Sequence, residues 1–425
     1  MPDALLSAPP HARWALDSGP MMTPAEALAK ILSCIEPLGE REDVPLVHAA
    51  GRVLARALTS DVDVPPFRKA MMDGYALRAE DGGGPRNTAG EFELVCVGES
   101  RAGAAFDGLV ASGQCVEIYT GAPVPESCDA VVVVEKSRRS SNRVALLDRP
   151  RSGQHIAGVG EVLANGAAVF GPGRRLSPAD MGVLAAIGAH PVPCWRRARV
   201  GILTTGDELV PPWQRPGPAQ IREGNTLQLA ARCLALELEV TRVGIAPDDE
   251  EVLEKEIGEA LDVSDALITT GGVSMGRYDL VGKVFERLGV VPHLHKVAIK
   301  PGKPIWFGLA GEKPVFGLPG NPVSALLGME IFARPALAKL AGEAGAALEP
   351  TLWAGRWAGG PVAADERQQN LPCRIERERG ELPRLVPIPW RGSADVVAVA
   401  EAQAFAVVPA GTALDAGGPV DYRPL

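Results

Sequence analysis

Apolar residues near the start of the chain recur at helical spacing. Thr23, Pro24 and Glu26 precede them as a capping box, with threonine as the cap, proline at the first helical position and glutamate at the third. The apolar positions that follow, as far as Ile35, share one face and predict an amphipathic helix. We expect residues 1–22, ahead of this helix, to form a flexible leader.

From about Val44 to Arg175 the pattern changes to short apolar and branched runs separated by glycine, proline and aspartate. Such runs predict small sheets joined by loops. They cover residues 92–97, 114–119 and 130–134. We expect a split N-terminal region, α+β and β-rich, over residues 23–195, with a β-rich subdomain inserted at about residues 60–155.

From Arg199 onward, predicted strands alternate with predicted helices. The strands cover residues 200–203, 240–245 and 266–269, with further strands near Val297, Ile305 and Val315. The helices cover residues 225–235, 280–288 and 322–340, with another that we expect Asp248 to cap, since Glu251 follows three residues later. Strands separated by helices predict βαβ units. We therefore place an α/β domain with a central, doubly wound, mostly parallel sheet at residues 196–343.

The tail from about Glu349 has no segment with helical periodicity. Its apolar runs, such as residues 404–408, are bounded by prolines and predict short strands. We place a small β-barrel-like domain at residues 348–425. The fold class predicted for the whole chain is multi-domain, α/β plus β.

Composition and charge narrow the class of protein. No apolar run approaches the about 18 residues of a membrane span, and no basic flank with an apolar stretch marks a secretory signal. The formal net charge of −9 argues against a surface that binds nucleic acid or anionic lipid. We expect a cytoplasmic protein with no nucleic-acid and no membrane partner.

The cysteines and histidines do not predict a metal centre. Seven cysteines are scattered without a Cys-x-x-Cys pair, which fits reduced thiols and neither a zinc cage nor an iron–sulfur cluster. His293 and His295 would share one face of a strand. Catalytic zinc usually needs three protein ligands, and no third ligand lies nearby in the sequence, so we do not favour a zinc site.

Glycine-rich turns follow several predicted strands of the α/β domain. They are residues 204–208, 269–274, 300–303 and 318–324. In open α/β sheets, ligands bind beyond the carboxyl ends of the strands, and glycines with helix N-termini suit phosphate or another oxyanion. The alternative interpretation is that each turn only serves tight packing.

Charged residues lie in or near these turns. If Lys296 to Lys300 is extended, those two lysines point to the same side and, with Lys303, suit separated phosphates; a solvated edge strand is the alternative. The carboxylates are Asp73, Glu208, Asp248 and Asp279. With phosphates, carboxylates suit Mg²⁺, whereas Asp248 and Asp279 could alternatively be helix caps.

No P-loop or dinucleotide fingerprint is present. The residues alone therefore indicate a multi-domain protein that binds a phosphorylated or nucleotide-like anion, and they do not name a reaction.

Several motifs resemble a known family. They are residues 70–76 (AMMDGYA), 120–123 (TGAP), 205–209 (TGDEL), 270–276 (TGGVSMG), 300–304 (KPGKP) and 317–324 (GLPGNPVS). Together, and in this order, they resemble the molybdopterin molybdotransferases of the MoeA family and their gephyrin-like relatives, from about residue 23 to the C-terminus. The resemblance implies that the α/β domain is a MogA-like molybdopterin-binding domain.

The resemblance also implies a function in molybdenum cofactor biosynthesis. Molybdenum from molybdate would be inserted into adenylylated molybdopterin, with release of AMP and help from Mg²⁺. It further implies a homodimer whose cleft lies between the α/β domain of one chain and the N-terminal region of the other. The molybdopterin adenylyltransferase and molybdoenzyme acceptors would be further partners.

Site residues follow from the same motifs. The resemblance implies catalytic roles for Asp73, Glu208, Asp248, Asp279, Lys296 and Lys300, with Glu208, Asp248 and Asp279 as metal ligands. It implies contacts to the cofactor or to molybdate at Thr120, Gly271, Gly272, Ser274, Lys303, Pro319, Gly320, Asn321, Ser324, Arg367 and Ser393.

The sequence departs from the family in three places. Val162 stands where the family has an aspartate, and nearby arginines are missing. Pro372 replaces the second of two arginines of the C-terminal domain, and Arg68 with Lys69 precedes the 70–76 motif where small or polar residues are usual. Two alternatives therefore stay open, a non-catalytic protein that binds or delivers the cofactor and a nucleotide-processing enzyme that shares only the α/β module.

Overall fold

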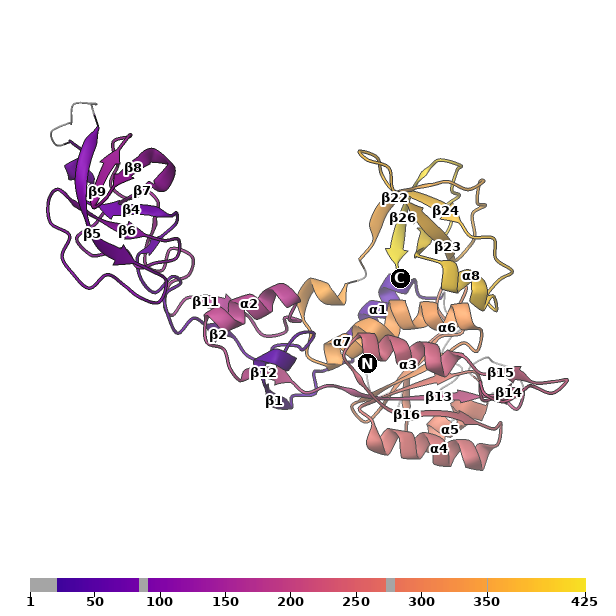
Figure 1. The fold of residues 1–425 in the computed structure, drawn as a ribbon. Coiled ribbons are helices and arrows are strands. Elements are labelled where there is room, and N and C mark those ends of the chain that lie inside the picture. Colours follow the sequence, from indigo (N-terminus) through magenta and orange to yellow (C-terminus); the bar gives the residue numbers. More distant parts are fainter. Residues whose placement is uncertain (1–20, 84–90, 273–279, 350) are drawn as a thin grey trace.

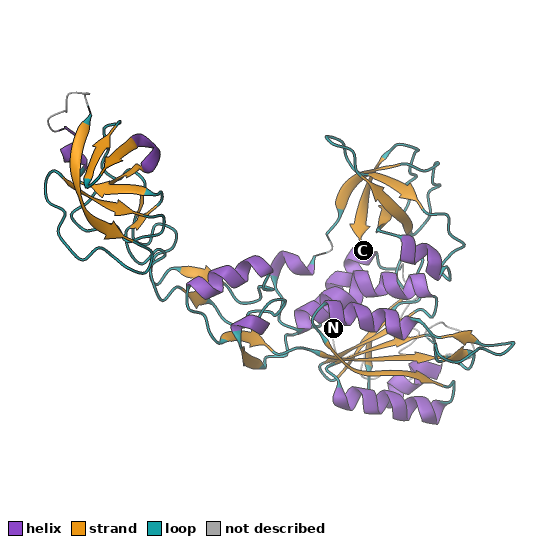
Figure 2. Cartoon of the chain, viewed as in Figure 1, coloured by secondary structure: helices purple, strands orange, loops and turns teal. Residues whose placement is uncertain are grey.

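The computed structural model describes residues 21–83, 91–272, 280–349 and 351–425. The molecule is elongated, with a small β-subdomain at one end and the α/β domain with the C-terminal β-domain at the other (Figure 1). Figure 2 shows that most helices gather around the α/β domain, while the far end is made mainly of strands with short helical turns. Among the residues described, no helix is long and apolar enough to cross a membrane.

The first helix, α1 (Pro24–Ser33), has the predicted capping box. The Thr23 hydroxyl accepts from the Glu26 N–H at 3.3 Å, and the Glu26 carboxylate accepts from the Thr23 N–H at 2.9 Å. The buried face of α1, including Leu28 and Ile31, packs into the core of the α/β domain. The chain thus begins against the α/β domain before it runs outward.

Short two-stranded sheets carry the chain outward and back. β1 (Arg41–Val44) pairs with β12 (Val192–Trp195), β2 (Leu58–Thr59) with β11 (Ala168–Phe170), and β3 (Lys69–Ala70) with β10 (Ile156–Ala157), all antiparallel. Helix α2 (Pro178–Ala186) and the 3-10 turn η2 (Leu46–His48) lie beside them. Each pair joins a segment that runs outward to one that returns. These paired segments, residues 41–70 and 156–195, form what we call the neck.

The far end is one mixed sheet with the order β7-β4-β6-β5-β9-β8, which we call the tip. Its strands are β4 (Gly74–Leu77), β5 (Phe92–Ser100), β6 (Gln114–Ile118), β7 (Ala130–Val133), β8 (Ser137–Ser140) and β9 (Arg143–Leu146), with 3-10 turns η3 (Ala79–Gly83) and η4 (Val134–Lys136). The predicted runs at residues 92–97, 114–119 and 130–134 are all strands. Buried apolar side chains cover both faces of this sheet.

The α/β domain has a sheet with the order β16-β13-β17-β21-β20-β18. Its strands are β13 (Arg199–Thr205), β16 (Glu239–Ala246), β17 (Ala266–Thr270), β18 (Val291–His295), β20 (Trp306–Ala310) and β21 (Lys313–Leu318). The neighbours from β16 to β21 are parallel, and β20 and β18 add antiparallel strands at one edge. A short pair, β14 (Leu209–Val210) with β15 (Ile221–Arg222), lies outside this sheet.

Helices cover both faces of the central sheet, so the prediction of a doubly wound fold is confirmed. α3 (Asn225–Ala235) and α6 (Pro322–Gly328) share one core with α1, while α4 (Glu250–Val263) and α5 (Leu280–Arg287) share the core on the opposite face (Figure 1).

The predicted long helix at residues 322–340 is present with one irregular turn. A π-helical turn, η5 (Met329–Ala333), separates α6 from α7 (Arg334–Leu340). It precedes Pro335, which has no N–H to donate to the regular helical ladder.

The C-terminal domain is a closed barrel, as predicted. Its order is β23-β24-β22-β26-β25, and a pairing of β23 with β25 closes it. The strands are β22 (Trp353–Trp357), β23 (Gln368–Glu376), β24 (Arg384–Pro387), β25 (Ala404–Val408) and β26 (Pro419–Pro424), preceded by the 3-10 turn η6 (Gly345–Leu348).

The expectation of a helix-free tail is wrong. Helix α8 (Val396–Glu401) begins at the cap Asp395, whose side chain accepts from the Ala398 N–H at 3.1 Å. Six residues are too short to show a helical period, and the cap alone marks this helix.

The backbone from Lys296 to Lys300 is not extended, so the condition for the two lysines to point to the same side is not met. Lys296 has a φ of +69°, so the chain turns directly after β18. The strand β19 (Ile299–Lys300) then leaves the central sheet and pairs with β23 at the edge of the barrel sheet. The sequence does not show this turn, because a left-handed lysine is rare and leaves no pattern.

Candidate active site

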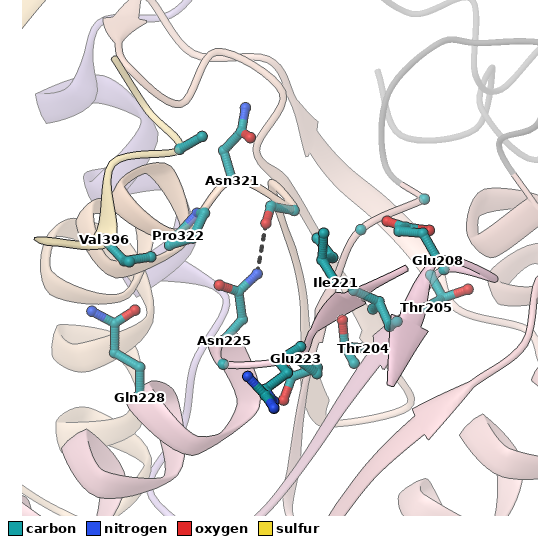
Figure 3. A pocket seen from close by; sticks show the side chains of 18 of the residues that line it. Thr204, Thr205, Glu208, Ile221, Glu223, Asn225, Gln228, Asn321, Pro322 and Val396 are labelled. Atoms are coloured by element: carbon teal, nitrogen blue, oxygen red, sulfur yellow. Dashed lines mark hydrogen bonds between the residues drawn. The ribbon is translucent and has the colours of Figure 1, made fainter. Parts of the chain in front are cut away.

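A pocket of about 920 Å³ opens at the carboxyl ends of β13 and β17. Its volume is in the range of small-molecule sites, about 300–1,000 Å³. The residues of our predicted site that line it are Glu208, Asp248, Gly271, Gly272, Gly320 and Asn321. Figure 3 shows side chains from several elements around it. Three of the four predicted turns therefore meet at one place, while residues 300–303 are not part of the lining.

The glycines of this pocket allow its turns to touch. Gly271 has a φ of +85°, and a Cβ at this position would lie 2.6 Å from the Thr205 carbonyl oxygen. A Cβ on Gly320 would lie 3.5 Å from the Gly271 Cα. The pocket floor is therefore backbone, whose N–H groups can approach an anion closely.

Asp248 is not the helix cap that the sequence predicted. Asp249 caps α4, and its carboxylate accepts from the N–H groups of Glu251 and Val252, both at 3.0 Å. Asp248 instead accepts a hydrogen bond from the Thr205 hydroxyl at the end of β13. The predicted cap was therefore one residue too early, and Asp248 lies in the wall of the pocket instead.

Glu208 is the second carboxylate of the wall. Its side chain folds over Gly206, where a Cβ would lie 2.5 Å from Oε2. Between the two, Asp207 Oδ1 accepts from the Asp248 N–H at 3.0 Å and ties the β13 turn to the β16–α4 turn.

Among the residues described, no group of three or more histidine, cysteine or acidic side chains could hold a metal ion. Two carboxylates with ligand phosphates nevertheless fit Mg²⁺, which usually takes one or two protein carboxylates and keeps waters. Glu208 and Asp248 are the residues that could supply them.

The opposite wall begins at α3. Asn225 Nδ2 donates to the Gly320 carbonyl oxygen at 2.7 Å, the contact drawn in Figure 3. Glu223 is buried and accepts from the Thr226 N–H at 2.8 Å, which stabilises the first turn of α3. Sequence reasoning placed this helix correctly but missed Asn225, because an asparagine at a helix start predicts only a cap.

The C-terminal domain completes this wall with α8. Ala394, Val396 and Val399 line the pocket and give it an apolar side (Figure 3). Val396 and Val399 were missed because the helix that carries them was not predicted, and Ala394 lies directly before the cap of that helix.

The predicted lysines lie outside the pocket lining, at the junction with the barrel. Lys300 Nζ donates to Asp365 Oδ2 at 2.7 Å, and Asp365 Oδ1 accepts from the Arg367 N–H at 3.0 Å. The hydrogen bond from Lys300, followed by that from Arg367, lowers the pKa of Asp365. The predicted residues Lys300 and Arg367 are therefore brought together by an aspartate that sequence reasoning missed.

Two predicted serines lie near this junction. A Cβ on Gly302 would lie 3.8 Å from the buried Ser324 side chain. The Ser393 carbonyl oxygen accepts from the Val323 N–H at 3.0 Å. The 300–303 turn, the start of α6 and the segment before α8 thus converge on one region.

Two other lysines have backbone roles in the described contacts. The Lys296 N–H donates to Ile305 O at 2.9 Å, and the Lys303 carbonyl accepts from Val297 at 3.0 Å. Pro319 precedes Gly320 in its turn. Ser274 and Asp279 lie outside the described residues.

Asp73 and Thr120 form a pair in the tip. Asp73 Oδ1 accepts from the Thr120 N–H and from the Thr120 hydroxyl, both at 2.7 Å. These hydrogen bonds lower the pKa of Asp73. Within one chain, the tip and the pocket are at opposite ends of the molecule (Figure 1). The structure therefore does not bring this pair to the pocket of its own chain.

The departures from the family motifs are also visible. The Val162 side chain is exposed in the neck, at 78%. Pro372 lies in β23 opposite Phe405, and Arg374 forms an ion pair with Glu401. Neither Pro372 nor Arg374 reaches the pocket lining.

Known proteins share the sequence and the architecture of this chain. Three family profiles match in order: MoeA N-terminal region (domain I and II) at residues 22–188, probable molybdopterin binding domain at 201–339, and MoeA C-terminal region (domain IV) at 358–425. The fold and its pocket thus define a protein of the molybdopterin-binding class.

The similarity extends over most of the chain. Molybdopterin molybdenumtransferase of Haemophilus influenzae is 36% identical over 324 residues, 76% of this chain and 78% of the relative. That of Synechococcus elongatus is 33% identical over 395 residues, 90% and 94% of the two chains. The crystal structure of the molybdopterin biosynthesis moeA protein from Pyrococcus horikoshii OT3 has a TM-score of 0.81 at 29% identity, covering 96% of this chain and all of the other. The chain belongs to the MoeA family of molybdopterin molybdenumtransferases, enzymes of molybdenum cofactor biosynthesis.

Proposed function

We propose that the chain inserts molybdenum from molybdate into adenylylated molybdopterin and releases AMP. The observation that carries this proposal is the convergence of glycine turns and the carboxylates Glu208 and Asp248 on one pocket at the sheet edge. The pterin phosphate and AMP are joined by a phosphoanhydride, which needs backbone N–H groups around it and charge compensation as it breaks. The apolar side formed by Val396 and Val399 suits the flat ring of the pterin or of adenine.

Glu208 and Asp248 would hold Mg²⁺ together with the phosphates of the substrate. When bound, the ion would compensate the charge that develops on the phosphate oxygens. The residues of the chain fix the Asp248 carboxylate: Thr205 holds its side chain by a hydrogen bond, and Asp207 holds the backbone of the same turn. The predicted ligand Asp279 stays a proposal from the family motif.

The molybdate oxyanion would bind at the junction with the barrel. Lys300 and Arg367 supply two cations there, and Ser324 lies beside the same turn. Lys303 and Ser393 belong to this group by their place in the motifs. Asp365 keeps the cations in position, and a bound anion would share them with it.

The tip of a second copy would complete the pocket. Asp73 and Thr120 form an ordered polar pair that has no contact with the pocket of its own chain. A homodimer would bring the tip of one chain to the pocket of the other, which gives this pair a role in the reaction. The Met71 and Met72 side chains beside it are exposed, at 52% and 42%, as expected for a surface that a partner covers.

The cellular setting follows from the thiols and the reaction. All seven cysteines are free thiols, which supports a reducing compartment such as the cytoplasm. The molybdopterin adenylyltransferase would supply the substrate, and a molybdoenzyme would accept the product.

The test is an assay with purified chain, adenylylated molybdopterin, molybdate and Mg²⁺, in which AMP and molybdenum-loaded pterin are measured together. We expect both products in equal amounts, and neither without molybdate. Binding of the adenylylated pterin without AMP release would support the alternative, a protein that only holds or delivers the cofactor.

A further inference from the structure

Cys96 and Cys115 lie opposite each other on neighbouring strands of the tip. β5 and β6 run parallel there, and the two cysteines are Cα partners in their register. Neighbouring strands lie about 4.8 Å apart, within the Cα separation of about 4.4–6.8 Å that a disulfide spans. Both side chains pack in the same apolar cluster, with Cys115 fully buried and Cys96 at its margin.

The two cysteines are neighbours in the register and share one apolar cluster. Cys96 Sγ donates to the Gly98 carbonyl oxygen at 3.4 Å, beside an irregularity in the β5–β6 register. Because Cys96 uses its one proton in this bond, its sulfur is left as the acceptor for the Cys115 thiol. Burial, followed by the electrostatic interaction and the hydrogen bond with Cys96, raises the pKa of Cys115. Cys115 therefore stays protonated as a thiol beside the sulfur of the half-buried Cys96.

Charged groups surround the accessible sulfur. Glu117 is the main cause of the raised pKa of Arg139, to which it is hydrogen-bonded, and Cys96 adds to this shift. The Arg139 guanidinium and Tyr75 therefore both lie near Cys96. Cys96 is half-buried near a cation, and Cys115 beside it is fully buried, so a small oxidant reaches Cys96 first and Cys115 is placed to resolve it.

We propose that Cys96 and Cys115 form a dithiol site that hydroperoxides oxidise to a disulfide within one chain. The Cys96 sulfur attacks the peroxide, the O–O bond breaks, and Cys96 becomes a sulfenic acid while an alcohol or water leaves. The Cys115 sulfur then attacks the Cys96 sulfur, the S–O bond breaks, and the hydroxyl leaves with the Cys115 proton as water. The two thiols together lose two electrons, and the peroxide gains them.

The test is titration of the full chain with hydrogen peroxide, followed by thiol counting after unfolding and by peptide mapping without reductant. Trypsin leaves Cys115 and Cys128 in one peptide, residues 102–136, so a glutamate-specific protease that cuts after Glu117 and Glu126 is needed to separate them. We expect loss of two of the seven thiols, a Cys96–Cys115 linked peptide, and full recovery with dithiothreitol.

Three variants with checked melting curves make the result decisive. Cys128→Ser is the matched control, because Cys128 is as buried as Cys115 and lies in the same subdomain, and it should lose the same two thiols as the wild type. Cys96→Ser should keep all six of its remaining thiols, and Cys115→Ser should leave a Cys96 sulfenic acid that dimedone traps. A link from Cys96 to Cys128 or to a second chain, or equal thiol loss in Cys96→Ser, would overturn the proposal.

Discussion

The Thr205 hydroxyl donates a hydrogen bond to the carboxylate of Asp248, while the next residue, Asp249, caps helix α4. Two consecutive aspartates therefore have separate tasks, one in the wall of the pocket and one in the stability of a helix. This division allows chemistry and folding to be tested independently with neighbouring substitutions.

Asp248→Asn should lower AMP release by about 10²-fold or more, the scale observed when one electrostatic group leaves a preorganised site. Asparagine keeps the size of the side chain and can still accept from Thr205, so the melting temperature should stay within about 2 °C. The measurements are the AMP release rate and a thermal melt of the same sample.

Asp249→Ala is the matched control. It removes the cap from α4, which should cost about 1 kcal/mol of the free energy of unfolding, while AMP release stays close to that of the wild type. If Asp248→Asn and Asp249→Ala lose activity equally, Asp248 has no catalytic role that Asp249 lacks.

The helix positions of the α/β domain could be predicted because periodicity and caps are local. The predicted range 225–235 matches α3, and the capping box at Thr23 is present. The error at Asp248 arose because either of two adjacent aspartates fits the pattern, and only the direction of the chain after β16 decides between them. Local sequence patterns therefore predict where helices and strands lie better than they predict the role of a single side chain.

The missed site residues depend on contacts between distant segments. Asp365 holds Lys300 across the junction with the barrel, and Val396 reaches the pocket from a six-residue helix. No periodicity or spacing marks such residues. The separation of Asp73 from the pocket was likewise invisible locally, and it is this separation that supports a second copy as a functional partner.

Lys300→Ala should weaken molybdate binding about 10-fold or more, because one charge-assisted hydrogen bond, worth about 1.5–3 kcal/mol, is lost. Lys255 is an exposed lysine of helix α4 and has no part in this junction. Lys255→Ala removes the same positive charge elsewhere and is therefore the control. The measurement is calorimetric titration with molybdate at low salt. Equal affinity in the two variants would remove Lys300 from the oxyanion site.

Gly271→Ala should damage the pocket more than the same change at Gly289. Both glycines have positive φ, at +85° and +71°, but only at Gly271 would the new Cβ meet backbone, the Thr205 carbonyl at 2.6 Å. Both variants carry the same backbone strain of about 1 kcal/mol, because both positions have positive φ. The difference between their stabilities therefore measures the steric clash of the new Cβ at Gly271. We expect Gly271→Ala to have a clearly lower free energy of unfolding and lower activity than Gly289→Ala. Equal losses in the two variants would mean that the turn at Gly271 can move to accept the new Cβ.

Asp265 should make the stability of the chain depend on acid pH. Burial alone would raise its pKa, but hydrogen bonds from Arg196 at 2.6 Å and from the Arg199 N–H at 2.8 Å outweigh it and hold the pKa at about 2. The pKa is lower in the folded than in the unfolded chain, so the stabilisation is complete above the ordinary value of 3.8 and is lost as the pH falls through 2.

Asp265→Asn tests this by urea unfolding at pH 7 and at pH 3. We expect the variant to be less stable by about 2–4 kcal/mol at pH 7, with a smaller difference at pH 3. A difference that does not shrink toward acid would show that the carboxylate charge contributes nothing.

The most direct test of the composite site mixes two inactive chains. We expect Asp73→Asn, in the tip, and Asp248→Asn, in the pocket, each to abolish most AMP release. If the pocket of one chain works with the tip of another, a mixed dimer has one intact site, and random mixing of equal amounts should restore about a quarter of the wild-type rate. Mixed chains that, after exchange of subunits, release no more AMP than either variant alone would contradict a site shared between two copies.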